Sequence, residues 1–230
     1  MSAMSRFTSY GTCALCGKRT TKAAMTRHLG QCSAEHEASR GKAQRLFRVR
    51  IEDAFSPIFW MDVEIKTNAT LEELDDFLRH RWLECCGHLS AFYIEGDTYM
   101  VPSYVLGSFG DPNERSMKVK LDEVLSKGST FQHVYDFGTS TELKLRVVGE
   151  RQGRTGSEPL RLLSHNEAPV WECEVCGEDA DWICTSCMYE RENPFYCKLH
   201  AEDHDCEEPE MLLLVVNSPR MGMCGYGGPE

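Results

Sequence analysis

The chain has 230 residues, of which 41% are hydrophobic and 10% aromatic, so it can form a folded core and lacks the composition of a disordered protein. The longest apolar run, residues 211–216, is too short for a membrane helix, and residues 1–10 contain no apolar segment. We therefore expect no signal peptide, no membrane span and a location in the cytoplasm.

The net charge of −11 is distributed unevenly along the chain. Residues 1–45 contain eight Lys or Arg against two Glu, a net charge of +6. Residues 171–230 contain three Lys or Arg against fourteen Asp or Glu, a net charge of −11. An acidic surface repels phosphate backbones and suits a basic protein partner, and a basic segment does the reverse. The alternative is that both segments are ordinary solvated surfaces.

The first element in the chain is a metal-binding pattern, Cys13-x2-Cys16-x11-His28-x3-Cys32. Thr21 can cap a helix that places His28 and Cys32 one turn apart on the same face. The pattern resembles a Cys2HisCys variant of the small zinc finger, one residue shorter between the inner ligands than the common form. We predict that residues 1–45 form a zinc finger with a basic flank.

Seven basic side chains surround this predicted finger. They are Lys18, Arg19, Lys22 and Arg27 near the start of the helix, followed by Arg40, Lys42 and Arg45. The start of a finger helix is the part that enters the major groove of DNA, but one finger covers only about three base pairs. The finger therefore either contributes to nucleic-acid binding or serves to contact protein and hold the end of the chain.

Strand and helix patterns follow the finger. Apolar and charged residues alternate over residues 47–52 and 61–66, which predicts two half-buried strands. Thr70 and Glu73 form a capping box at the start of a helix, and Gly87 ends its apolar stripe.

Turn residues predict two hairpins after this helix, over residues 91–101 and 131–148. The central domain, residues 46–150, is therefore predicted to be α+β. We expect an antiparallel sheet with one main helix, flanked by small zinc-stapled modules.

An ordered set of motifs in this central domain resembles the plasmid pRiA4b ORF-3-like family. The motifs are Ile58-Phe59-Trp60, Thr70-Leu71-Glu72-Glu73-Leu74, His88-Leu89-Ser90-Ala91-Phe92-Tyr93-Ile94 and Val134-Tyr135-Asp136-Phe137-Gly138. Members often carry Asp after the Phe-Gly and Trp two residues later, where this chain has Thr139 and Thr141. The family occurs on mobile elements without an assigned activity, so the resemblance implies a fold and no reaction. The chain also resembles members with a C-terminal zinc module and an Asn-Ser-Pro-Arg tail.

The candidates for catalysis are few. Asp136-Phe137-Gly138 resembles the magnesium motif of kinases, but no glycine-rich phosphate loop or His-Arg-Asp loop accompanies it. An enzyme would have to use His88, His133 and Asp136. We expect no catalytic residues and no enzymatic activity.

Residues 151–170 contain Gly153, Gly156, Pro159 and Pro169 among polar residues, which predicts a linker.

The segment after this linker carries eight metal-ligand residues in the pattern Cys173-x2-Cys176-x7-Cys184-x2-Cys187-x9-Cys197-x2-His200-x3-His204-x-Cys206. Eight such ligands suit two tetrahedral zinc sites, which gives three zinc ions together with the finger. A disulfide framework and an iron–sulfur cluster are the alternatives. The absence of a secretory segment disfavours the first, and the two histidines disfavour the second.

Two pairings of these ligands are open. In a cross-brace over residues 171–206, one ion is held by Cys173, Cys176, Cys197 and His200, and the other by Cys184, Cys187, His204 and Cys206. A sequential arrangement uses the same residues in chain order.

The last segment, residues 207–230, is predicted to be a strand followed by a glycine-rich tail. We expect the apolar residues 211–216 to pack on the central sheet or on the zinc module. The tail would then lie on folded protein, where Arg220 and Tyr226 form a recognition surface. We interpret Cys85 and Cys86 as thiols at the edge of the core, and Cys224 as a reactive thiol or an additional ligand.

These features favour a zinc-binding, non-enzymatic adaptor that contacts another macromolecule, most simply a protein. The alternative is a nucleic-acid-binding regulator that uses residues 1–45.

Overall fold

The structure, a computed structural model, describes residues 9–101, 114–206, 208 and 211–229. The chain divides into two compact units. The first unit comprises the residues up to Phe77 together with Leu89–Glu167, and the second comprises Leu78–His88 together with Ala168–Glu230. The predictions for residues 1–8, 102–113, 207, 209, 210 and 230 fall outside the described residues.

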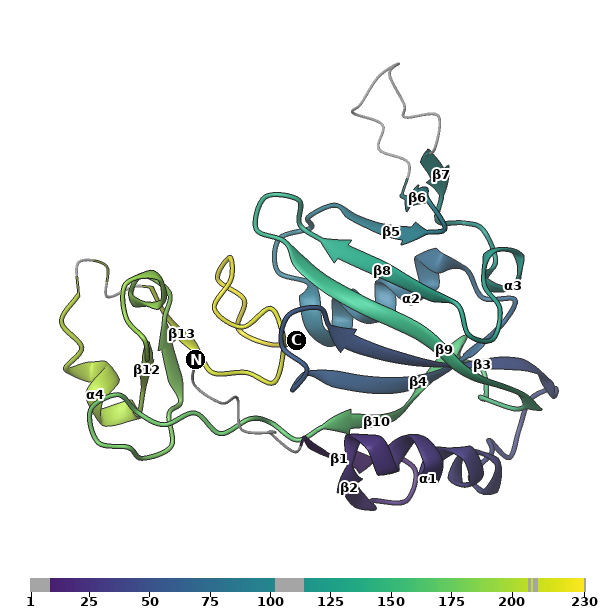
Figure 1. The fold of residues 1–230 in the computed structure, drawn as a ribbon, viewed down its shortest axis with the longest axis horizontal. Helices are drawn as coiled ribbons and strands as arrows, with labels where there is room; N and C mark the ends of the chain where they lie inside the picture. Colours follow the sequence, from purple (N-terminus) through teal and green to yellow (C-terminus); the bar gives the residue numbers. More distant parts are fainter. Residues whose placement is uncertain (1–8, 102–113, 207, 209–210, 230) are drawn as a thin grey trace, which may run out of the picture. The chain divides into compact units, whose positions relative to one another are not determined.

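The first unit is built on a ten-stranded sheet with the order β2-β1-β10-β4-β3-β9-β8-β5-β6-β7, among the described residues. In chain order the strands are β1 Tyr10–Cys13, β2 Arg19–Thr21, β3 Gln44–Asp53, β4 Trp60–Lys66, β5 Ser90–Ile94, β6 Asp97–Met100, β7 Glu114–Ser116, β8 Thr130–Tyr135, β9 Thr141–Gly153 and β10 Leu160–Asn166. Of the described pairs in this sheet, β6–β7 is parallel and the others are antiparallel (Figure 1).

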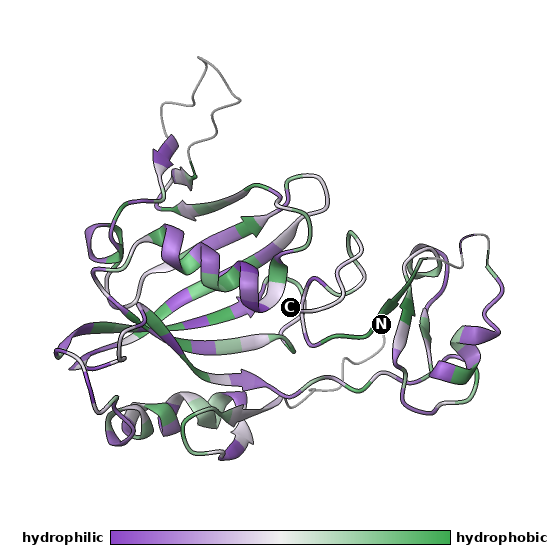
Figure 2. Cartoon of the chain, turned by 180° about the vertical axis from the view of Figure 1, so that it is seen from behind, coloured by the Kyte–Doolittle hydropathy of each residue, from purple (hydrophilic) through white to green (hydrophobic). Residues whose placement is uncertain are grey.

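Helix α2 (Leu71–Leu78) lies against one face of this sheet (Figures 1 and 2). Its capping box forms as predicted, because the amide of Thr70 donates to Glu73 Oε2 at 2.8 Å and the amide of Glu73 donates to Thr70 Oγ1 at 3.2 Å. A short helix, α3 (Leu121–Val124), follows β7. Both predicted hairpins form, as β5–β6 and β8–β9. The α+β class is therefore confirmed.

The N-terminal finger is part of the large sheet rather than a separate module. Strand β1 pairs with β10 and with β2, and helix α1 (Lys22–Glu35) follows β2 directly. Thr21 caps α1 by accepting the amide of Ala24 at 3.3 Å. The buried side of the helix joins one apolar cluster made by Cys13, Met25, Leu29, Cys32, Trp60 and Leu163.

The segment predicted as a linker also differs from expectation. Strand β9 extends to Gly153, and β10 occupies residues 160–166, between β1 and β4 in the sheet. Its polar side chains find partners inside the fold: Arg161 binds Glu64, and Ser164 Oγ donates to Asp62 Oδ2 at 2.9 Å. A register shift between Leu162 and Ser164 interrupts the alternation that marks a strand in sequence.

Strand β4 is buried on both faces, although its sequence predicts one polar, solvated face. The apolar side chains Met61, Val63 and Ile65 are fully buried, but Asp62 is also 0% exposed and Glu64 only 1% exposed. The reason is that α1 covers the charged face of the strand. Buried carboxylates need both counter-charges and hydrogen bonds, and the neighbouring strands supply them.

Three arginines neutralise these two carboxylates. Arg50 makes a bidentate pair with Asp62 at 2.9 and 2.8 Å. Arg151 pairs with Glu64 at 2.7 and 2.9 Å, and Arg161 pairs with the same carboxylate at 3.1 and 2.8 Å.

The same arginines also fasten α1 to the sheet. Arg50 Nη2 donates to Thr26 Oγ1 at 3.0 Å, and Arg151 and Arg161 each donate to the carbonyl of Ser33 at 3.0 Å. Cations at the carbonyl end of a helix are favoured because they satisfy free carbonyls and oppose the helix dipole.

The second unit contains a small three-stranded sheet with the order β12-β11-β13 in its described part. The strands are β11 Trp182–Cys184, β12 Phe195–Tyr196 and β13 Leu212–Leu214, accompanied by the 3-10 helix η2 Cys187–Tyr189 and helix α4 Lys198–Glu202. The predicted apolar run therefore pairs with the zinc module through β11 and β13. Residues 78–88, expected within the central domain, belong to this unit and contain the π-helix η1 (Arg79–Leu83).

The tail contradicts one prediction. Arg220 is 0% exposed and Tyr226 only 2% exposed, so these side chains do not form a recognition surface. Ser218 Oγ instead donates to the carbonyl of Trp82 at 2.7 Å. Gly222 lies so close to β11 that an added Cβ would be 3.2 Å from Ile183 Cδ1. The tail is therefore a packed part of the second unit.

No helix among the described residues is both long enough and apolar enough to cross a membrane.

The buried pair predicts a large effect of Asp62→Asn on stability. The substitution leaves the Arg50 guanidinium buried without its main counter-charge, so the free energy of unfolding should fall by about 3–5 kcal/mol. Chemical denaturation followed by fluorescence measures this change. Glu150→Gln is the matched control, because Glu150 makes a bidentate pair with Arg45 at an exposed position. There we expect a loss of no more than about 1 kcal/mol. Equal losses for both variants would contradict the importance of burial.

Candidate metal centres

The described residues contain four groups that could hold a metal ion, and each offers three cysteine sulfurs and one histidine nitrogen. The ligand atoms of each group lie within 4.8 Å of one another. The groups are Cys13, Cys16, His28 and Cys32; Cys173, Cys176, Cys197 and His200; Cys184, Cys187, His204 and Cys206; and Cys85, Cys86, His88 and Cys224. The sequence predicts the first set, predicts the second and third only in the cross-brace alternative, and does not predict the fourth.

The finger group is assembled by the turn between β1 and β2 and by one face of α1. Cys13 Sγ lies 3.8 Å from Cys32 Sγ, and Cys16 Sγ lies 3.3 Å from His28 Nε2. The turn needs Gly17, whose φ is +75°. The pKa of the Cys16 thiol is lowered chiefly because the backbone of Lys18 donates to its sulfur, which favours the thiolate that binds metal.

The first group of the second unit joins two Cys-x2-Cys/His turns. Cys176 Sγ lies 3.8 Å from Cys197 Sγ, and His200 Nδ1 lies 3.6 Å from Cys173 Sγ and 3.2 Å from Cys197 Sγ. Burial raises the pKa of the Cys173 thiol, because it disfavours the charged thiolate. Hydrogen bonds from backbone amides to the sulfur have the larger combined effect and lower the pKa of Cys173 to about 6. This turn is therefore preorganised for a cation.

The second group of this unit lies between β11, η2 and the residues after α4. Cys184 Sγ lies 3.8 Å from Cys206 Sγ, and Cys187 Sγ lies 3.5 Å from His204 Nε2. The ring of Tyr196 packs against His204 with centroids 4.2 Å apart, which orients the imidazole. Tyr196 in turn donates its hydroxyl to Glu174 at 2.8 Å.

These distances fit tetrahedral zinc. Zinc–sulfur bonds of about 2.3 Å place the sulfurs of a tetrahedron about 3.8 Å apart, and an imidazole nitrogen about 3.5 Å from each sulfur. The two groups between Cys173 and Cys206 also have the composition of the cross-brace, not of the sequential arrangement.

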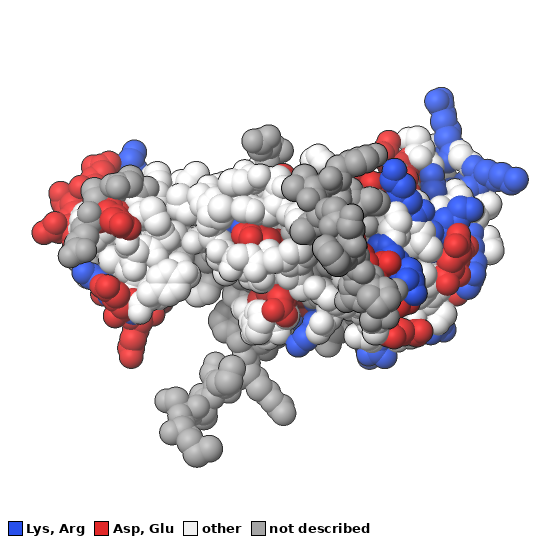
Figure 3. Space-filling model, turned by 90° about the horizontal axis from the view of Figure 1, so that it is seen from above, with Lys and Arg blue, Asp and Glu red and all other residues white. Residues whose placement is uncertain are grey.

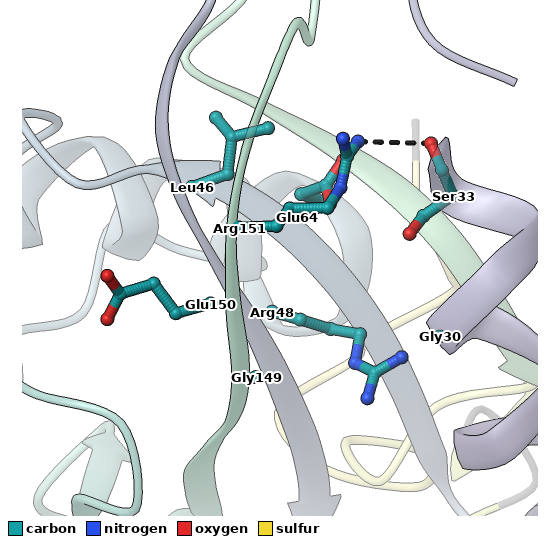
Figure 4. Close-up of a pocket in the computed structure, with 8 residues that line it drawn as sticks. All are labelled: Gly30, Ser33, Leu46, Arg48, Glu64, Gly149, Glu150 and Arg151. Carbon is teal, nitrogen blue, oxygen red and sulfur yellow. Dashed lines mark hydrogen bonds and ion pairs between the residues drawn. The ribbon is translucent and has the colours of Figure 1, made fainter. Parts of the chain in front are cut away.

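The cavity beneath α1 is part of an interface rather than a ligand site. It has a volume of about 110 Å³ and is lined by residues of α1, β3, β4 and β9, among them Gly30, Arg48, Glu64 and Arg151 (Figure 4). Pockets for small molecules are larger, about 300–1,000 Å³. Burial lowers the pKa of Arg48, whose guanidinium reaches toward Gly30.

The residues considered for catalysis have separate partners. His133 is 0% exposed and its Nε2 lies 2.6 Å from Asp75 Oδ1, which also accepts a hydrogen bond from Ser90 Oγ at 2.8 Å. Asp136 has a φ of +63° and accepts the amide of Gly138 at 2.9 Å, the geometry of a turn. His88 Nε2 lies 3.3 Å from Cys224 Sγ, in the fourth group.

Three of the basic side chains near the finger are engaged in ion pairs. Arg19 binds Glu167 in a bidentate pair, Lys22 Nζ lies 2.6 Å from Glu52 Oε1, and Arg45 binds Glu150. The four others, Lys18, Arg27, Arg40 and Lys42, are exposed.

The cross-brace predicts which pairs of substitutions remove one ion and which remove two. Cys173→Ser with Cys197→Ser damages one site, so native mass spectrometry should find one ion fewer than in the unmodified protein. Cys173→Ser with Cys184→Ser damages two sites and should remove two ions. A sequential arrangement reverses these two results.

The comparisons with known proteins concern mainly the central region. No curated protein matches this chain. A solved structure of the protein of unknown function MM3350 from Methanosarcina mazei Go1 is similar at 16% identity with a TM-score of 0.44, over 54% of this chain and 68% of that one. The model of the plasmid pRiA4b ORF-3-like protein family matches residues 44–182, which is more than half of the 230 residues and includes β10. The chain belongs to the plasmid pRiA4b ORF-3-like protein family.

Proposed function

We propose that the protein is a zinc-binding, non-enzymatic adaptor whose second unit binds a basic segment of a partner protein. Three zinc ions occupy the three ligand groups predicted from sequence. Thiolate and imidazole donors in a closed four-ligand set suit structural zinc, which stabilises modules too small to have a core of their own. Cysteine ligands that form no disulfides are typical of a reducing compartment, which supports a cytoplasmic location.

The charge of the second unit supports a basic partner. Its exposed side chains between residues 171 and 208 include two cations, Arg191 and Lys198. Among the described residues of the same range, the exposed acidic side chains are Glu172, Glu174, Glu178, Asp179, Asp181, Glu190, Glu192, Glu202, Asp203, Asp205 and Glu208 (Figure 3). A thiolate-rich zinc site adds about one further negative charge per ion. Such a surface attracts basic segments and repels nucleic-acid backbones.

The observation that carries the proposal is that large apolar side chains stand exposed within this acidic surface. Tyr189 is 82% exposed, Leu199 is 63% exposed and Val175 is 62% exposed. Val175 and Leu199 lie in the two turns that supply ligands to the same metal group. Aromatic and aliphatic anchors surrounded by polar residues are typical of protein-binding surfaces.

A small cavity beside these turns supports the same proposal. It has a volume of about 210 Å³ and is lined by Trp182, Lys198, Ala201, Glu202 and Leu212. A cavity of this size and lining suits one apolar side chain of a bound segment, with Glu202 available to a neighbouring cation.

Nucleic-acid binding by residues 1–45 is the alternative. The exposed cations Lys18, Arg27, Arg40 and Lys42 favour it. Against it, Arg19 and Lys22, near the start of the finger helix, are engaged with carboxylates. An enzyme using His88, His133 and Asp136 is less favoured still, because each of these side chains has a structural partner.

A peptide-display screen against the full chain tests the adaptor proposal. We expect enrichment of peptides that combine several Lys or Arg with one large apolar residue. The double variant Tyr189→Ser and Leu199→Ser should weaken their binding at least about tenfold, measured by fluorescence anisotropy, because it removes the exposed anchors. Phe55→Ser is the control, since Phe55 is 77% exposed in the first unit.

Unchanged binding by the double variant would contradict the proposal. So would the absence of enriched peptides together with binding of duplex DNA or RNA that weakens steeply with salt and on Lys18→Gln and Arg27→Gln. That second result would support the nucleic-acid alternative.

A further inference from the structure

The fourth ligand group joins two segments that are far apart in sequence. Cys85, Cys86 and His88 follow the π-helix η1, and Cys224 lies in the tail, 136 residues after His88. Cys86 Sγ lies 3.8 Å from Cys224 Sγ, and His88 Nε2 lies 3.3 Å from Cys224 Sγ. These are the separations expected for ligands of one tetrahedral zinc ion, about 3.8 and 3.5 Å.

The composition of the fourth group matches that of the other three. Each group contains three cysteines and one histidine. The chain has twelve cysteines, and the four groups together contain all of them. None of the twelve forms a disulfide, and Cys86 and Cys224 are separated by much more than a sulfur–sulfur bond, about 2.05 Å.

The backbone on both sides adopts unusual conformations that aim the ligands at one point. Gly87 has a φ of +70°, a backbone conformation that favours glycine. No atom lies within 4 Å of an added Cβ, so glycine is favoured here by the backbone conformation and not by steric crowding. Cys224 has a φ of +49°, which is uncommon for a residue with a side chain and costs about 1 kcal/mol or more. The surrounding structure must offset this cost.

A buried cation lies next to the ligand group. Arg220 is 0% exposed, and its Nη2 donates to Cys85 Sγ at 3.6 Å. A zinc ion with three thiolates and one imidazole carries a net charge of about −1, which an adjacent guanidinium balances. Arg220 was expected to form an exposed recognition surface, but it is buried beside this ligand group.

We propose that Cys85, Cys86, His88 and Cys224 form a fourth zinc site, which fastens the tail to the segment that follows η1. Zinc at this site closes a long loop of the chain and offsets the strained conformation of Cys224. Two hydrogen bonds also help to hold the tail in place. Ser218 Oγ donates to the carbonyl of Trp82 at 2.7 Å, and the amide of Arg220 donates to Ser218 Oγ at 2.9 Å. The ordered tail is therefore a zinc-dependent feature of the second unit.

Native mass spectrometry of the full chain, purified under reducing conditions with excess zinc and then desalted, tests this proposal. The unmodified protein should retain four zinc ions, and Cys224→Ser should retain three. Met221→Ala, in the same tail but outside the ligand set, should retain four. Hydrogen–deuterium exchange should show residues 217–229 losing protection in Cys224→Ser and keeping it in Met221→Ala.

A second pair of variants separates ligation from folding. His88→Cys keeps a zinc ligand and should retain four ions, whereas His88→Ala should retain three. Any other pair of counts overturns the proposal. Three ions in the unmodified protein, or the mass of a Cys86–Cys224 disulfide under these conditions, would overturn it as well.

Discussion

The burial of two carboxylates on one strand constrains the first unit more than any other interaction. Asp62 and Glu64 lie on β4 with almost no exposure, so the structure must surround them with cations and donors. Arg50, Arg151 and Arg161 come from three different strands, and all three also donate to α1. These ion pairs and hydrogen bonds connect the finger helix α1 to strands β3, β4, β9 and β10 of the sheet. An apolar finger–sheet interface alone would not specify the position of α1 as strictly, because the ion pairs require matched geometry.

The second unit is subject to a different constraint, because it is too small to form a large apolar core. In the described part of this unit the sheet has three short strands, and the buried apolar cluster includes Cys184 and Cys187, which are candidate ligands. Burial of so little apolar surface cannot offset the entropy of ordering these turns. The proposed ligands come from β11, η2 and the residues around α4, so a bound ion would make these turns mutually dependent. Tyr189 and Leu199 do not contribute to a core and are exposed to solvent.

Features with a local physical cause were predicted well from the sequence. The capping box of α2, the cap of α1, the two hairpins and the Cys-x2-Cys pairs depend on neighbouring residues, so their spacing identifies them. The grouping of the ligands between Cys173 and Cys206 joins separate turns, and the spacing alone left it open. The linker prediction for residues 151–170 was wrong because β10 carries Arg161 and Ser164, whose polarity in sequence suggests solvent. In the structure both side chains bind buried carboxylates of β4.

The sequence by itself therefore determined the α+β class and the positions of the two hairpins, and it identified the candidate ligands of the finger and of the segment between Cys173 and Cys206, since each follows from periodicity or short spacing. Only the tertiary structure decided which polar faces are buried and where the tail lies. Arg220 and Tyr226 looked accessible in a glycine-rich tail, yet both are buried. Cys85, Cys86 and Cys224 gave no recognisable ligand spacing, because one ligand is contributed from far along the chain. Contacts between residues so distant in sequence leave no periodic signal, and only the folded chain brings their ligand atoms within 4.8 Å of one another.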